Sequence, residues 1–133
     1  MTDRSNNTPC FHGRSLHPTI IAIHAENGTE AWKAELEKVS CLCNLPKMSH
    51  DGLNLYAAIG GDGAGLYNID TVKKRVGWIY KPRGKGKPHG YPALNKAGTV
   101  AYIRVKVDKK NDELHAVDTK KGKLLWKRVP HQS

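Results

Sequence analysis

Three tryptophans occupy the same position in a repeated pattern, and this repeat constrains the fold more than any other feature of the sequence. The strongest copy, residues 116–126, has the form AxDxxxGxxxW. Weaker copies cover residues 22–32 and 68–78. The tryptophans are 46 and 48 residues apart, a period typical of supersecondary units that stack on one another. The repeat therefore predicts a modular architecture.

Each copy combines a short apolar strand, a polar turn and a second strand ending at tryptophan, which predicts a β-hairpin. Aspartate favours such a turn by accepting backbone hydrogen bonds, and glycine adopts positive φ without steric cost. The middle copy has Lys74 where the others have glycine, so we expect its turn to differ in shape. The positions that fit the pattern are Ala22, Gly28, Trp32, Asp70, Trp78, Ala116, Asp118, Gly122 and Trp126.

Further strand patterns complete four-stranded units around the second and third copies. Residues 39–81 contain four strand candidates, residues 90–129 repeat that layout, and residues 16–38 supply only half of it. We expect strands centred near residues 22, 56, 67, 78, 102, 116 and 125. The predicted fold class is all-β, a partial β-propeller of four-stranded antiparallel blades.

The segments outside these units are polar. We expect residues 1–15 to form a flexible arm, residues 82–89 a basic loop between blades, and residues 130–133 a tail. No apolar run approaches the roughly 18 residues of a membrane span, and the N-terminus lacks the apolar segment of a signal peptide. The compartment is left open.

The repeat resembles the pyrroloquinoline-quinone-type (PQQ-like) β-propeller repeat of the quinoprotein alcohol dehydrogenase-like superfamily, over residues 16–129. That family's AxDxxxGxxxW segment is called the tryptophan-docking motif. The resemblance implies that the three tryptophans are docking rings, received by the small residues of a neighbouring motif. A ring at one end of the array then lacks a partner, and the docking direction decides which end. Related repeats often occur in the cell envelope.

A propeller normally closes with about four to eight blades, and an open array leaves both terminal faces uncovered. We therefore expect the chain to be part of a longer protein or a protomer that completes a ring with other copies. Residues 1–70 carry a net charge of −3 and residues 71–133 a net charge of +13. This asymmetry suggests that the open ends meet head to tail.

The basic residues are densest between the second and third units, where glycine and proline separate the cations. The segment is weakly similar to an AT-hook, which lies in the minor groove of DNA. We favour a solvated loop and keep anion binding as the alternative. The candidate anion-binding residues are Lys81, Arg83, Lys85 and Lys87.

No pattern for catalytic, cofactor-binding or metal-binding residues emerges. The seven histidines form no HxxxH or HExxH group, and GxSxG is absent. The glycine-rich residues 60–65 lie between two strand candidates, which favours a hairpin turn over phosphate binding. Cys41 and Cys43 alternate in a strand pattern, which favours buried thiols over metal ligands.

These observations predict a non-catalytic PQQ-like repeat module without cofactor. It would act as a protein-binding scaffold unit of a larger or oligomeric propeller, through a protein partner or self-association at its open blade edges. One alternative is a fragment, inactive alone, of a PQQ-dependent dehydrogenase, but the calcium ligands and Asp base of that enzyme are not recognisable here. The second alternative is a basic nucleic-acid-binding protein.

Overall fold

A computed structural model of the chain describes residues 4–5, 19–36, 46–60, 63–84 and 86–129. The predictions for Cys41, Cys43, Lys85 and the tail lie outside these residues. All regular secondary structure in the described ranges is β-strand, in agreement with the predicted fold class. Within those ranges no helix is long and apolar enough to cross a membrane.

The described residues contain eleven strands in three antiparallel sheets, and strands that follow one another within a sheet lie side by side. The first sheet comprises β1 (Arg4–Ser5), β2 (Thr19–Ile23) and β3 (Glu30–Glu35). The second comprises β4 (Lys47–Met48), β5 (Asn54–Ile59), β6 (Gly65–Asp70) and β7 (Arg75–Tyr80). The third comprises β8 (Lys87–Leu94), β9 (Val100–Lys106), β10 (Asp112–Asp118) and β11 (Leu124–Arg128). The seven predicted strand centres all fall within strands.

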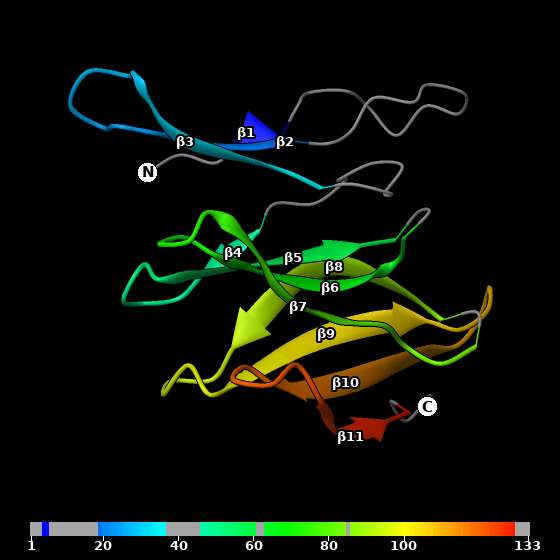
Figure 1. Cartoon of the computed structure of the whole chain (residues 1–133). Helices are drawn as coiled ribbons and strands as arrows, with labels where there is room; N and C mark the ends of the chain where they lie inside the picture. Colours follow the sequence, from blue (N-terminus) through cyan, green and yellow to red (C-terminus); the bar gives the residue numbers. More distant parts are fainter. Residues whose placement is uncertain (1–3, 6–18, 37–45, 61–62, 85, 130–133) are drawn as a thin grey trace.

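The sheets stack face to face, with the first and third on opposite sides of the second (Figure 1). The run Leu55 to Ile59 in β5 is buried throughout, because alternate side chains face opposite neighbours. The apolar cluster between the first and second sheets contains Ile20, Ala34, Leu36, Leu55, Ala57, Ile59, Tyr67 and Ile69. The cluster between the second and third contains Tyr56, Leu66, Ala101, Ile103, Val105 and Val117. Successive blades of a partial β-propeller pack in this way.

Two strand boundaries differ from the predictions. The third sheet begins at Lys87 rather than residue 90, so part of the predicted loop 82–89 is strand. Tertiary packing explains this, because Pro88 is buried and its carbonyl oxygen would lie 2.7 Å from a Cβ placed on Gly60. Arg4 and Ser5, within the predicted flexible arm 1–15, pair with β2. The rest of that arm lies outside the described residues.

The hairpin turns that precede the three tryptophans have the same backbone geometry. In each, the residue at the glycine position donates its N–H to the carbonyl four residues earlier. These distances are 2.8 Å for Gly28, 2.7 Å for Lys74 and 2.8 Å for Gly122. Each hairpin also has a register shift immediately before the turn, at Ala22/Ile23, Asn68/Ile69 and Ala116/Val117.

The expectation that the middle turn would differ in shape was wrong. Lys74 adopts a φ of 61°, close to the 74° of Gly28 and the 70° of Gly122. The Asp70 carboxylate supports this turn by accepting hydrogen bonds from the N–H groups of Val72 and Lys73, both at 2.9 Å. These bonds also lower the pKa of Asp70 below its usual value. Local hydrogen bonding thus stabilises a conformation that is unfavourable for a lysine.

Candidate binding face

Trp78 lies in the contact between the second and third sheets, against the turn that follows Asp118. Its indole Nε1 donates a hydrogen bond to the carbonyl of Thr119 at 2.9 Å. A Cβ placed on Gly122 would lie 2.5 Å from both Cδ2 and Cε3 of the Trp78 ring. Because real Cβ atoms do not approach so closely, glycine at position 122 is what lets the ring rest on this turn.

Buried polar groups accompany Trp78 in the same contact. The Tyr80 hydroxyl lies 2.7 Å from Nδ1 of His115, and Nε2 of His115 lies 3.0 Å from Oε1 of Glu113. His115 is only 3% exposed, and both of its ring nitrogens have partners. Burial raises the pKa of Tyr80, and the negative charge of Glu113 adds to this effect. Satisfied polar groups of this kind fix the register between packed sheets.

Trp32 packs beside the apolar cluster shared by the first and second sheets, together with Met48 and Val76. The ring is partly buried. Trp32 and Trp78 therefore both take part in contacts between successive sheets.

Trp126, in contrast, has no sheet beyond it in the described structure, and 45% of its surface is exposed. It pairs with Ala116 across β10 and β11, and Ala116 pairs with Tyr102 across β9 and β10. The rings of Tyr102 and Trp126 are 6.1 Å apart. We call this exposed side of the third sheet the outer face. It comprises Tyr102, Arg104, Asp112, Leu114, Trp126 and Arg128.

A basic hollow of about 430 Å³ lies on the outer face beside these aromatic rings. Leu114 and Val129 provide apolar surface in its wall. The charged side chains are four cations and one carboxylate, so the hollow favours negatively charged groups. Its polar lining residues are Arg104, Lys106, Lys109, Lys110, Asn111 and Asp112.

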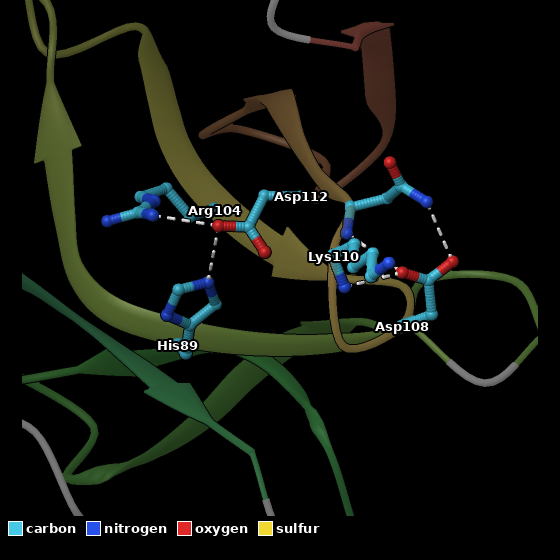
Figure 2. A network of polar contacts seen from close by, with 6 residues as sticks. His89, Arg104, Asp108, Lys110 and Asp112 are labelled. Carbon is cyan, nitrogen blue, oxygen red and sulfur yellow. Dashed lines mark hydrogen bonds and ion pairs between the residues drawn. The ribbon is translucent and has the colours of Figure 1, made fainter. Parts of the chain in front are cut away.

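Asp112, one of the residues that line the hollow, stands between the side chains of Arg104 and His89 (Figure 2). Its Oδ2 accepts a hydrogen bond from Nη2 of Arg104 at 2.7 Å. Nε2 of His89 lies 3.3 Å from the same oxygen, but without hydrogen-bond alignment. The Arg104 guanidinium, aided by the charge of His89, holds the pKa of Asp112 below its usual value. Asp112 therefore stays ionised and orients Arg104 across the face.

The loop beside the hollow is ordered by its own aspartate. Asp108 accepts hydrogen bonds from the N–H groups of Lys110 and Asn111, each at 2.8 Å, as Figure 2 shows. The bond from the Asn111 side chain, also at 2.8 Å, is the main reason that the pKa of Asp108 is lowered. The turn thus holds the lysines at the edge of the hollow on a defined backbone.

The cations of the hollow are not those singled out from the sequence. Lys81, Arg83 and Lys87 are exposed, but none of them lines the hollow. Alternation in β9 was the available signal, because Arg104 lies between the buried Ile103 and Val105. A basic residue between two core residues must point away from the core.

The opposite end of the stack presents the turn of residues 24–29, which we call the Gly28 turn. No described atom lies within 4 Å of a Cβ placed on Gly28. Glu26 and Glu30 are exposed on either side of it. Within the described residues, no group of three or more His, Cys, Asp or Glu side chains could hold a metal ion.

Comparisons with known proteins support the fold alone. A solved structure of Kuenenia stuttgartiensis hydrazine synthase aligns with 86% of this chain at a TM-score of 0.68 and 18% sequence identity. The chain spans 32% of the length of that structure. No protein-family model matches the sequence, and no match was found among curated proteins. At this identity the likeness concerns the all-β, propeller-like architecture.

Proposed function

We propose that the chain is a non-catalytic PQQ-like repeat module that binds another protein through the outer face. The observation that carries this proposal is the pair formed by the exposed Trp126 and the partly exposed Tyr102. On the second sheet, Tyr56 and Trp78 have the corresponding places in the register, and their rings are 5.9 Å apart. There the third sheet covers them.

The correspondence extends beyond the two rings. Leu114 precedes Ala116 on the outer face as Leu66 precedes Asn68 on the second sheet. Leu66 is fully buried, whereas Leu114 is partly exposed in the wall of the hollow. Exposed aromatic and aliphatic residues that lie together are typical of protein contacts. The outer face thus repeats, in solvent, the residue pattern of a contact made inside the same chain.

The charges of the outer face indicate the kind of protein that it binds. Leu66 lies between Ala58 and Tyr80 in the second sheet, whereas Leu114 lies between Arg104 and Arg128 in the third. An apolar blade would leave the Arg128 guanidinium without a partner and Arg104 with Asp112 alone, which is costly once water is excluded. We therefore expect a partner with an apolar pocket for Trp126 and carboxylates near Arg104 and Arg128.

Site-specific photo-crosslinking in producing cells tests this proposal. A photoreactive phenylalanine in place of Trp126 should crosslink to protein, because that side chain lies in the contact. The same residue in place of Val72, which is 68% exposed on a turn of the second sheet, is the matched control. Crosslinks to nucleic acid alone, or equal protein crosslinks from both positions, would contradict the proposal.

Nucleic acid is the second candidate partner, and the four cations of the hollow favour it. Binding to phosphates would weaken steeply with salt, with a slope that reflects the number of phosphates contacted. Titration of the chain with a short duplex at two salt concentrations measures this slope. Replacing Lys106 and Lys109 with glutamine should reduce the slope if this alternative holds.

A further inference from the structure

We propose that the partner is a second copy of this chain, with Trp126 of one copy resting on the Gly28 turn of the next. The inference rests on the proposed function and names the partner of the same outer face. It follows from a comparison between the contact that the chain makes internally and the two surfaces that it leaves open.

The internal contact requires two matching parts. One part is an indole ring on the last strand of a sheet, here Trp78. The other part is a turn that contains glycine, here Gly122. The Trp78 ring lies so close to this turn that a side chain at position 122 would clash with it. The Thr119 carbonyl of the same turn accepts the indole N–H at 2.9 Å.

The outer face and the Gly28 turn repeat these two parts, and within the described residues neither has a partner sheet. Gly28 and Gly122 have φ values of 74° and 70°, and both donate at 2.8 Å to the carbonyl four residues earlier. Ala25 corresponds to Thr119, so its carbonyl is placed to accept an indole N–H. The Trp78 ring contacts Gly122, while no described atom lies within 4 Å of a Cβ placed on Gly28.

The lysine at position 74 explains why Trp126 should bind the Gly28 turn and not the middle turn. The middle turn has the same backbone geometry, but its lysine carries the Cβ that glycine lacks. Of the three turns, only those with Gly28 and Gly122 allow an indole ring to lie directly on the backbone. Gly122 is occupied within the chain, which leaves Gly28 for Trp126.

Charge distribution favours the same pairing. The exposed charged side chains described in the first sheet are Glu26, Glu30 and Lys33. The outer face presents Arg104 and Arg128, of which Arg104 is partly neutralised by Asp112. Residues 1–70 carry a net charge of −3 and residues 71–133 a net charge of +13. The N-terminal half of one copy therefore attracts the C-terminal half of another, which favours a head-to-tail contact. Because the two surfaces of the contact differ, repetition of it closes a ring or extends an open array.

Two glycine variants distinguish the effect of the proposed contact on self-association from the effect of backbone strain. Gly28→Ala places a methyl group where the indole of Trp126 would lie, so self-association should weaken at least about tenfold. Gly98→Ala is the matched control, because Gly98 has a φ of 73° and also has no atom within 4 Å of its Cβ position. It carries the same strain outside the proposed contact and should associate like the parent. Sedimentation over a concentration series at low salt measures both.

Mixing two defective chains tests the direction of the contact. Trp126→Ala retains an intact Gly28 turn, and Gly28→Ala retains an intact Trp126 ring. Each should be a monomer alone, while a mixture should form heterodimers with one junction and nothing larger. Circular dichroism of each variant establishes that it is folded before the comparison.

The possible results separate this inference from the proposed function. A monomeric parent whose Trp126 position crosslinks to a different protein would overturn the inference and leave the proposed function standing. No protein crosslink from that position would overturn both. Equal weakening by Gly28→Ala and Gly98→Ala, or a mixture that stays monomeric, would also overturn the head-to-tail contact.

Discussion

The covered face of the second sheet and the outer face of the third have the same register but different surroundings. Tyr56 and Trp78 on the covered face take part in an apolar contact, while Tyr102 and Trp126 stand beside a basic hollow. The residues beside the rings differ in the same sense: the covered face has Ala58 where the outer face has the charged Arg104. The comparison teaches that the repeat determines where a ring points. The next sheet determines whether that ring is buried.

The largest expected effect comes from truncating the two rings. Trp78→Ala should lower the free energy of unfolding by about 3 to 5 kcal/mol, because it leaves a cavity between two sheets. Trp126→Ala should lower it by less than about 1 kcal/mol in the monomer, since its ring is already exposed to water. Urea denaturation of dilute protein in high salt, where self-association is suppressed, measures both values. Equal losses would show that the two faces do not differ as described.

A smaller effect should follow from filling the space beneath Trp78. Gly122→Ala forces the ring away from the turn and should cost about 1 to 3 kcal/mol. Gly98→Ala carries the same backbone strain at a φ of 73° but meets no neighbour, so it serves as the control. The difference between the two variants isolates the contact with the ring. A difference near zero would mean that this contact contributes nothing to stability.

The middle turn offers an opportunity to stabilise the chain. Lys74→Gly removes the cost of a φ of 61° for lysine, although glycine gains entropy in the unfolded state. We expect a net gain of about 0.5 to 1 kcal/mol in the free energy of unfolding. Lys73→Gly, one residue earlier and without positive φ, should instead be neutral or destabilising. A loss of stability in Lys74→Gly would contradict the strain assigned to this turn.

The smallest effect concerns the charges of the outer face and depends on pH. Because Arg104 lowers the pKa of Asp112 below 3.8 in the folded chain, ionised Asp112 stabilises the fold above that pH. This contribution is lost as pH falls through the lowered pKa. The parent should therefore be more stable than Asp112→Asn near neutral pH, and the difference should shrink below 3.8. Thermal melts of both proteins across this range measure it, and a constant difference would contradict the pairing.

The strand positions could be predicted from the sequence because they depend on local patterns. The motif repeats two strands and a turn, and a turn closed by a backbone hydrogen bond leaves little freedom in register. Alternation around Ile103 and Val105 likewise marked which side chains face the core.

The errors arose where contacts between distant segments decided the outcome. Residues 87–89 became strand because β8 packs against the glycine at position 60. Lys74 is an exception, because local hydrogen bonds to Asp70 and the pairing of its own two strands hold that turn in a glycine-like conformation. The basic hollow is lined by one hairpin, residues 104–114, together with Val129 after β11, so its cations were visible in the sequence and only the contribution of Val129 depends on the fold.

The all-β class, the repeat and the presence of three hairpins could be derived from the sequence alone, since these follow from side-chain alternation and turn chemistry within short segments. The packing of the sheets was needed to show that Trp78 lies against Gly122, whereas no described residue covers Gly28 and Trp126 is 45% exposed. The three motifs have similar local preferences, and their hairpin pattern does not show which sheet will cover each ring. The order of stacking supplies that information, because each following sheet covers the ring of the sheet before it, whereas no described sheet covers Trp126.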